Sequence, residues 1–497
     1  MTSPLDSLSD STLLKDAIFT DEGQILSPNR FAVLDPATGQ VLGTVRNMTA
    51  EDATSAIRSA QAAWTQWRGL TGKQRHRILL DWFNLLVAHG EDLARLITAE
   101  QGKPIGEARG EVAYGASFVE WYAEEAKRVN GEILSTFDNG RRLLVMKQSV
   151  GVCVAITPWN FPLAMITRKV APALAAGCPV IIKPAESTPL TALAVGELAM
   201  RAGVPEGVLS VITADAKRSI AIGKVLCASD AVRHLSFTGS TEVGRILMAQ
   251  SASTVKKLSL ELGGNAPFIV FDDADLDAAV DGAVASKYRN AGQTCVCANR
   301  LYVQEAIYDK FLEKFAARVR KMRVGNGFEE GVSIGPLIDS GAIEKVDAHV
   351  QDALAKGGRV LVGGHRLEGN FFAPTVIAEA NGGMLCASEE TFGPLAPVFR
   401  FKTESEVIVS ANDTAFGLAS YLYSRDVGRI FRVAEALEYG MVGINAGVIA
   451  SEHVPFGGVK QSGLGREGSH HGIDEYLEMK YLCVAGLLNE HKDPQPK

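Results

Sequence analysis

One loop of the sequence carries the residues best suited to covalent chemistry. Residues 287–300 read KYRNAGQTCVCANR, with Cys295 and Cys297 separated by one residue. A cysteine thiolate is a strong nucleophile, and backbone N–H groups of a glycine-containing loop can bind the oxyanion that forms when it attacks a carbonyl. Most cysteines are inert apolar residues. The polar neighbours Gln293 and Thr294 favour a functional loop. The choice between a nucleophilic and an inert cysteine depends on the rest of the chain.

Glu261 is a second candidate, because it ends an apolar, strand-like stretch in the run LELGGNAP. Burial raises the pKa of a carboxyl group toward the range that suits a general base. A structural glutamate with satisfied hydrogen bonds is the alternative that these residues leave open.

Two glycine-containing turns compete as phosphate-binding sites. Residues 463–468, GLGREG, match G-x-G-x-x-G, but they follow Lys-Gln-Ser rather than a strand, so we do not expect them to bind a dinucleotide. Residues 237–244, FTGSTEVG, lie between a predicted strand and a predicted helix whose N-terminus would offer N–H groups to a pyrophosphate. Lys183 and Glu186 follow the predicted strand 180–182 and could hold ribose hydroxyls. The alternatives are that residues 237–244 form a turn that binds no ligand and that Lys183 and Glu186 are solvated surface charges.

Composition narrows the class of protein. A chain of 497 residues is too long to fold around a single hydrophobic core, so two or three domains are predicted. The net charge of −7 argues against nucleic acid or an anionic membrane as partner. Seven scattered cysteines and an N-terminus without a signal segment predict a reduced, cytoplasmic protein. The longest apolar run, 170–182, is too short to span a bilayer, and no metal site is predicted.

The predicted elements place these motifs on an α/β framework. Helices are expected at 49–69, 74–101 and 105–130, followed by a projecting strand at 141–149. Strands and helices then alternate in two series, which predicts parallel sheets with ligand sites at the carboxyl ends of their strands. The expected fold is therefore two Rossmann-type domains plus a β-arm: 1–130 and 150–259 for nucleotide binding, 260–446 for catalysis, and 131–149 with 447–497 as arm and tail. Such arms commonly pair across subunits, so a homodimer or homotetramer is expected.

Five motifs, in order, resemble those of the NAD(P)-dependent aldehyde dehydrogenase superfamily: TPWNFP at 157–162, FTGSTEV at 237–243, LELGGNAP at 260–267, GQTCVCANR at 292–300 and ETFGP at 390–394. The resemblance extends from about residue 30 to 485. It implies that Cys295 attacks an aldehyde to give a thiohemiacetal whose oxyanion is held by the Asn160 amide and the Cys295 N–H. Hydride then passes to the nicotinamide, and Glu261 activates the water that hydrolyses the thioester. It also implies these cofactor contacts: Thr157, Pro158, Trp159, Lys183, Glu186, Phe237, Gly239, Ser240, Val243, Leu262, Glu390 and Phe392.

The resemblance is strongest to the succinate-semialdehyde dehydrogenase branch, and it narrows the substrate. Arg168 and Arg289 lie where members that oxidise neutral aldehydes usually have aromatic groups, and two guanidinium groups at a pocket mouth fit a substrate carboxylate. Ser451 could add a hydroxyl. Cys297 could form a disulfide with Cys295 that silences it. Glu186 favours NAD, because a carboxylate accepts the 2′-hydroxyl and repels the 2′-phosphate of NADP, although NADP use stays open.

Alternatives remain. Glutarate semialdehyde or another omega-carboxy aldehyde is an alternative substrate that differs from succinate semialdehyde in chain length. One methylene contributes only ~1–3 kcal/mol to discrimination between substrates. An acylating enzyme that uses coenzyme A is disfavoured by Glu261. A non-catalytic structural protein of the same fold, as some lens crystallins are, or a pure nucleotide-binding module would not need Cys295, Glu261 and Asn160 together.

Overall fold

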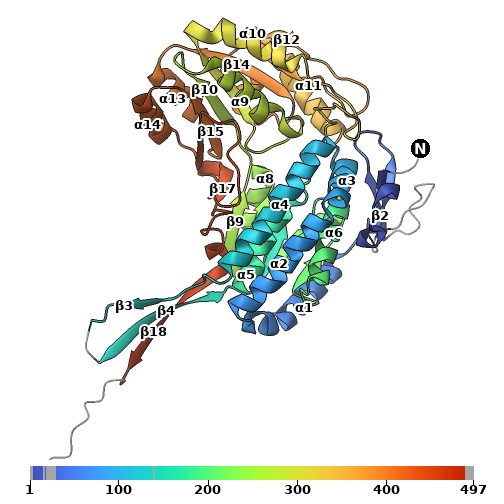
Figure 1. The fold of residues 1–497 in the computed structure, drawn as a ribbon, viewed down its shortest axis with the longest axis vertical. Coiled ribbons are helices and arrows are strands. Elements are labelled where there is room, and N and C mark those ends of the chain that lie inside the picture. Colours follow the sequence, from blue (N-terminus) through green and yellow to red (C-terminus); the bar gives the residue numbers. More distant parts are fainter. Residues whose placement is uncertain (1–3, 15–16, 18–28, 138–139, 487–497) are drawn as a thin grey trace, which may run out of the picture.

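The computed structural model describes residues 4–14, 17, 29–137 and 140–486. Figure 1 shows a first lobe coloured mainly blue to green and a second lobe coloured mainly yellow to orange. An arm projects from the first lobe. The predicted α/β class with two parallel-sheet domains is confirmed. Short 3-10 helices join the larger elements: η1 Pro4–Ser7, η2 Ser11–Leu14, η3 Ala252–Thr254, η4 Arg289–Gly292, η5 Glu305–Ile307, η6 Lys460–Ser462 and η7 Asp474–Tyr476.

The first lobe is built on a six-stranded sheet with the order β17-β9-β8-β5-β6-β7. Its strands are apolar because helices cover both faces, and all neighbours run parallel except the edge strand β17. The strands are β5 Val152–Ile156, β6 Val180–Lys183, β7 Leu209–Val211, β8 Val232–Thr238, β9 Lys257–Glu261 and β17 Gly463–Leu464. The crossover helices are α5 Ala164–Ala176, α6 Pro189–Arg201, α7 Ala216–Ala228 and α8 Thr241–Ser251.

Four N-terminal helices and the hairpin of β1 Arg30–Leu34 and β2 Val41–Arg46 belong to the same lobe. The helices are α1 Ala50–Gly69, α2 Gly72–Ala88, α3 Gly90–Gln101 and α4 Ile105–Glu125. The prediction of one helix over 74–101 is wrong, because His89 ends α2 in a non-helical conformation and Gly90 starts α3. The helix expected to reach Asn130 ends at Glu125.

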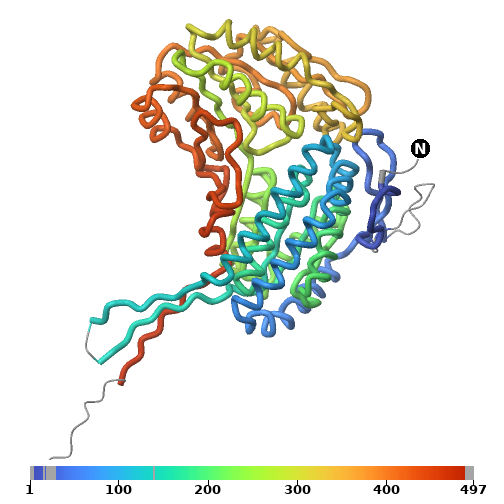
Figure 2. The backbone as a smooth tube through the Cα atoms, in the orientation of Figure 1, coloured from blue at the N-terminus to red at the C-terminus, as the bar shows by residue number. Residues whose placement is uncertain are grey.

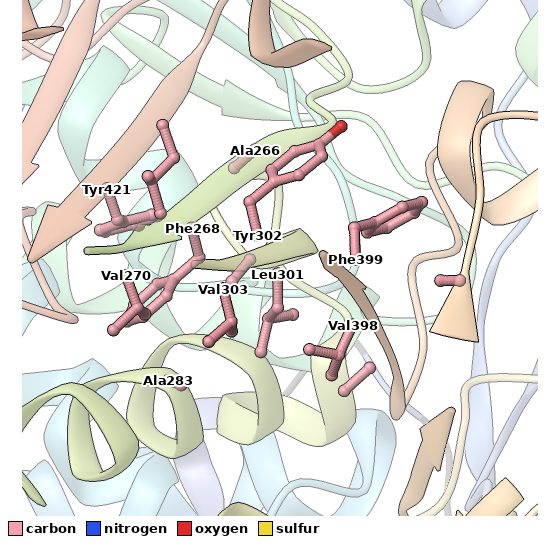
Figure 3. Close-up of a cluster of buried hydrophobic side chains, with 14 of the residues drawn as sticks. Ala266, Phe268, Val270, Ala283, Leu301, Tyr302, Val303, Val398, Phe399 and Tyr421 are labelled. Atoms are coloured by element: carbon pink, nitrogen blue, oxygen red, sulfur yellow. The ribbon is translucent and has the colours of Figure 1, made fainter. Parts of the chain in front are cut away.

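The second lobe contains a seven-stranded sheet with the order β12-β13-β14-β11-β10-β15-β16, parallel except for β12. Its strands are β10 Ala266–Val270, β11 Ala298–Gln304, β12 Arg359–Val362, β13 Thr375–Ala380, β14 Leu395–Phe401, β15 Ala419–Tyr423 and β16 Met441–Ile444. Its helices are α9 Leu276–Tyr288, α10 Tyr308–Val319, α11 Ser340–Ala355, α12 Leu385–Ser388, α13 Glu404–Asn412 and α14 Val427–Ala436. Figure 3 shows Val270, Leu301, Val303 and Val398 projecting from the sheet toward Ala283 on α9.

The arm is an antiparallel sheet of three strands, β18-β4-β3, formed by β3 Glu132–Leu134, β4 Arg141–Ser149 and β18 Leu477–Ala485. The predicted strand 141–149 is confirmed at both ends. Its partner β18 comes from the C-terminal end of the chain, and Figure 2 shows the two segments running out of the body together. The register runs from Leu477 opposite Ser149 to Ala485 opposite Arg141.

Within the described ranges, no helix combines the length and apolar content needed to cross a bilayer. The same residues contain no group of three or more His, Cys, Asp or Glu side chains arranged to hold a metal ion.

Candidate active site

A cavity of about 370 Å³ lies between the two lobes and brings together motifs that are far apart in the sequence. Asn160 follows β5, Gly239 and Ser240 follow β8, and Cys295 precedes β11. The two strand ends of the first lobe therefore face the loop of the second lobe that carries the candidate nucleophile. Of the predicted cofactor residues, seven line the cavity: Pro158, Trp159, Gly239, Ser240, Leu262, Glu390 and Phe392.

The loop that carries Cys295 begins with a left-handed turn directly after α9. Asn290, Ala291 and Gly292 have φ values of 51°, 54° and 75°, a region that side chains other than Asn and Asp rarely adopt. A Cβ at Gly292 would come within 2.2 Å of the Gly393 carbonyl oxygen, so only glycine fits there. The backbone N–H of Asn290 donates to Glu107 Oε2 at 2.8 Å, which ties the turn to helix α4.

The Cys295 thiol is held in its neutral form by its surroundings. Burial raises its pKa to about 12; Arg168 opposes this rise, whereas Glu261 and Glu390 reinforce it. At neutral pH the side chain is therefore a thiol whose proton has to be accepted by a base before or during attack.

Alkylation of Cys295 should therefore accelerate steeply with pH. In the enzyme without cofactor, the thiolate fraction increases about tenfold per pH unit below the pKa, so the rate with iodoacetamide should rise without a plateau between pH 7 and pH 9. Incorporation at Cys295 is measured by mass spectrometry of the digested protein. Cys295→Ser supplies the background from exposed Cys483. A plateau below pH 8 would show that the thiolate is stabilised, contrary to this prediction.

Asn160 lies beside Cys295 in the same cavity. Its side-chain Nδ2 donates to the Gln293 carbonyl oxygen at 3.0 Å, and an amide nitrogen carries two hydrogens. The second hydrogen has no acceptor among the described residues, so the amide can donate to an oxyanion formed at the Cys295 side of the cavity.

Glu261 ends β9 as a buried carboxyl group, and neither of its oxygens has a hydrogen-bond partner in the described part of the chain. Burial raises its pKa well above the usual range, Glu467 raises it further, and Arg168 and Lys169 oppose the rise. A desolvated carboxylate with free lone pairs is a strong proton acceptor. Glu261 also raises the pKa of Cys295, although it lies outside the cavity lining that includes Cys295 and Asn160.

Glu467 is a functional candidate that the sequence analysis missed. It forms an ion pair with Arg168 at 2.5 Å between Nε and Oε2, and another with Lys169, whose Nζ also donates to Ser236 Oγ at 3.0 Å. All three charged side chains are buried. The available signal was the Arg-Lys pair inside the apolar helix α5, because two buried cations require an acid partner. Glu467 lies in the GLGREG run.

Arg168, predicted at a pocket mouth, is a buried residue outside the cavity lining. Its side chain is 1% exposed, pairs with Glu467 and lies over the Phe456 ring at 4.2 Å. Arg289 is half-buried, with its guanidinium 4.8 Å from the Phe161 ring centre. Ser451 is half-buried, and its hydroxyl contacts the His453 ring at 3.2 Å.

Neither guanidinium group lines the cavity, but both arginines contact or accompany residues near Cys295. Arg168 Nη2 contacts the sulfur of Met165 at 3.1 Å, and Met165 lines the cavity together with Cys295. Arg289 lines a small hollow together with Thr294 and Val296, the two neighbours of Cys295. The charges of Arg168 and Arg289 both lower the pKa of Cys295.

The cofactor half of the site suits a dinucleotide. Ser240 caps α8 by accepting from the Val243 N–H at 3.3 Å, and a Cβ at Gly239 would meet the Phe237 ring at 2.4 Å. A glycine turn before a free helix N-terminus is the arrangement that binds pyrophosphate. In the same cavity the Trp159 and Phe392 rings meet edge to face at 5.6 Å, an apolar wall that fits a nicotinamide ring.

Glu390 also lines the cavity and is held by the Gly264 N–H, which donates to Oε1 at 3.0 Å. Burial raises its pKa to about 7, and the hydrogen bond from Gly264 opposes that rise. Lys183 is buried and Glu186 exposed, outside the cavity lining. The remaining predicted cofactor residues, Thr157, Phe237 and Val243, also lie outside the lining.

Helix α11 and the two residues before it supply cavity residues that the sequence analysis did not identify. Ile338, Asp339, Ala342 and Lys345 line the cavity opposite the first lobe. The apolar residues Ile343, Val346, Val350 and Ala353 recur at helical spacing, and Asp339 caps the helix by accepting from the Ala342 N–H at 2.8 Å. This spacing and the cap were the available signals.

Cys297 is buried and contacts a different group from the one predicted. Its sulfur lies 3.3 Å from Lys287 Nζ, and all seven cysteines of the chain are free thiols in this structure. The disulfide with Cys295 stays a prediction.

Comparisons with known proteins agree with this geometry. The aldehyde dehydrogenase family matches residues 25–482. A glutarate-semialdehyde dehydrogenase of Pseudomonas putida is 59% identical over 94% of this chain and 95% of its own length. An NADP-dependent succinate-semialdehyde dehydrogenase of Escherichia coli is 57% identical over 96% and 99%. The crystal structure of a succinate-semialdehyde dehydrogenase from Burkholderia pseudomallei superimposes with a TM-score of 0.93 at 61% identity, over 97% of this chain and all of that one.

Proposed function

The chain belongs to the aldehyde dehydrogenase family, and from this premise we propose that it oxidises succinate semialdehyde to succinate with reduction of NAD(P). The observation that supports the substrate assignment is the positive charge of Arg168 and Arg289 near the Cys295 loop, where Arg289 lines a hollow with Thr294 and Val296. Arg168 and Arg289 both act on the pKa of Cys295, and an aldehyde with a carboxylate at its far end matches that charge.

The reaction follows from the placement of three side chains. Cys295 Sγ attacks the aldehyde carbon as the thiol gives up its proton to a base, and the Glu261 carboxylate is kept for the hydrolytic step. The Asn160 amide and the Cys295 N–H donate to the oxyanion of the thiohemiacetal. A bound nicotinamide supplies the hydride acceptor. Glu261 then takes a proton from water as it attacks the thioester, which releases the carboxylic acid and restores the thiol.

The arginines have unequal roles in this proposal. Glu467 already occupies one edge of the Arg168 guanidinium, so Arg168 supplies mainly positive charge. Arg289 makes a ring contact with Phe161, and its five donors suit a bidentate grip on the substrate carboxylate. Ser451 is the proposed additional hydroxyl donor.

NAD is the proposed preferred cofactor, with NADP as a second possibility. The support is Glu186, an exposed carboxylate whose charge acts on the buried Lys183. A carboxylate beside the ribose repels a 2′-phosphate. The Escherichia coli relative is named for NADP, so the preference has to be measured on this chain.

Glutarate semialdehyde is the second candidate substrate, because a relative with 59% identity is a glutarate-semialdehyde dehydrogenase. The two guanidinium groups favour a terminal carboxylate without fixing the length of the carbon chain. We also propose a homodimer or homotetramer, which the exposed Ile133, Met479 and Tyr481 on the arm support.

Kinetics with three aldehydes test the substrate proposal. Succinate semialdehyde and glutarate semialdehyde should exceed butanal in kcat/KM by about 10- to 100-fold, the range expected from hydrogen bonds to a charged group. Arg289→Met should remove most of this advantage and leave butanal nearly unchanged. NAD and NADP are compared in the same assay.

Arg58→Met, which alters an exposed arginine on α1, is the control and should behave as the unmodified enzyme. Equal kcat/KM for butanal and the acidic aldehydes would remove the substrate assignment while leaving the dehydrogenase mechanism in place.

A further inference from the structure

A fully buried ion pair joins helix α4 to the segment that carries Asn160. Lys103 precedes α4, Glu111 lies within it, and the two side chains meet at 2.6 Å with no exposed surface. A buried pair of charges costs desolvation free energy that a pair of apolar side chains would not. The reaction described above uses neither residue.

The pair contacts residues 160–164 at four points. Lys103 Nζ donates to the Asn160 carbonyl oxygen at 2.7 Å and lies 3.8 Å from the centre of the Phe161 ring. Glu111 Oε1 accepts from the backbone N–H groups of Leu163 and Ala164 at 2.9 and 3.3 Å. The three ammonium hydrogens thus face a carboxylate, a carbonyl and an aromatic ring, which fixes the position of the lysine as well as that of the segment.

The Asn160 carbonyl oxygen accepts a second hydrogen bond from the other side of the cavity. Asn290 Nδ2 donates to it at 3.0 Å and to the Gln293 carbonyl oxygen at 3.3 Å. Since Asn160 Nδ2 donates to that same Gln293 carbonyl, the main chain of Asn160 and its amide are both tied to the loop of Cys295. Lys103 is the charged member of this network.

We propose that Lys103 is a positioning residue for the oxyanion-binding amide of Asn160. It fixes the Asn160 backbone through the carbonyl oxygen, so that the amide meets the oxyanion in one geometry. A donor displaced by a fraction of an ångström loses most of its preference for the transition state. The inference rests on the proposed role of Asn160 in binding the oxyanion.

A double-mutant cycle tests this indirect role. The variant Lys103→Met/Glu111→Gln removes both charges, so that neither is left buried without a partner. It should lower kcat/KM for succinate semialdehyde and for butanal alike by about tenfold or more, a fraction of the 10²–10³ that a whole oxyanion donor contributes. The Kd for NAD, measured by fluorescence titration, should stay within about twofold because cofactor contacts are untouched.

The Asn160→Ala background distinguishes positioning from general support. If Lys103 acts through Asn160, the pair variant should cause no further loss once the amide is absent. The same fractional loss in both backgrounds, or no loss in the unmodified background, would overturn the proposal. If Asn160→Ala itself retained full activity, the proposed role of Asn160 would fail instead.

Two further variants keep the test decisive. Lys314→Met/Asp277→Asn removes an exposed ion pair of 2.7 Å between α10 and α9 and should change nothing. If the pair variant did not bind NAD or did not fold, Lys103→Gln would replace it in the same cycle. Its smaller loss should again vanish in the Asn160→Ala background, and persistence there would equally contradict the inference.

Discussion

Replacement of Cys295 by alanine is expected to lower kcat by on the order of 10⁴-fold or more, because the thiol is the group that forms the covalent intermediate with the aldehyde carbon. The loss should be the same for every aldehyde tested. The sulfur of Cys297 contacts Lys287 Nζ and the Lys287 carbonyl oxygen, so it is not placed to substitute for the missing thiol.

Cofactor binding is expected to survive this change. Cys295→Ala removes one atom from a cavity whose cofactor half is formed by the turn after β8 and the Trp159–Phe392 pair. Titration of protein fluorescence with NAD measures the Kd, which should remain within about threefold of the unmodified value. Cys483→Ala, which changes an exposed thiol on the arm, serves as the control. If Cys295→Ala kept more than one per cent of the kcat of the unmodified enzyme, a thiohemiacetal route would be excluded.

Glu261→Gln is expected to separate the two halves of the reaction. The glutamine keeps the shape of the side chain but cannot accept a proton, so hydrolysis of the thioester should slow by about 10²–10⁴-fold. Rapid mixing with succinate semialdehyde and NAD should then give a burst of reduced cofactor that approaches one equivalent per Cys295, followed by slow turnover. The accumulated thioester is detected as an acyl adduct on Cys295 by mass spectrometry.

The size of the burst decides between two roles of Glu261. A full burst means that another base takes the thiol proton and that Glu261 serves only hydrolysis. A burst slowed to the same degree as steady-state turnover means that Glu261 also accepts the thiol proton. Glu475→Gln, at a partly exposed carboxylate that accepts from Ser259, is the control and should give neither effect. Unchanged steady-state turnover in Glu261→Gln would remove Glu261 from the mechanism.

The rise in pKa that burial gives both groups sets the pH dependence of the unmodified enzyme. Thiol and carboxyl must each lose a proton, and burial raises both pKa values. Activity should therefore decline as pH falls.

Much of the framework followed from local patterns. The strand 141–149 and the strands and helices between 150 and 260 were predictable because each consists of one apolar run between clear turn residues, as in Val152–Ile156 before Thr157-Pro158. The break at His89 was not, because the apolar periodicity of α2 and α3 continues across it.

The site residues that belong to short sequence motifs were predictable. The residues whose role depends on an ion pair between distant parts of the chain were not. Cys295 and Asn160 were named from their motifs, and the structure brings them into one cavity. The pairing of Arg168 with Glu467 joins residues about 300 positions apart in the chain, and no local pattern specifies such a pair. For the same reason the prediction of Arg168 at a pocket mouth did not include its buried ion pair.

The C-terminal segment also has a consequence for how the protein is made. Strand β17 completes the sheet edge beside Glu261, and Glu467 neutralises Arg168 and Lys169 within α5. While a ribosome is still translating the second lobe, the first lobe therefore carries two buried cations without their acid and an open edge at β9. The N-terminal lobe can collapse early, but its catalytic half becomes stable only after residues 463–467 emerge, so a chain arrested before them would be a substrate for chaperones and proteases.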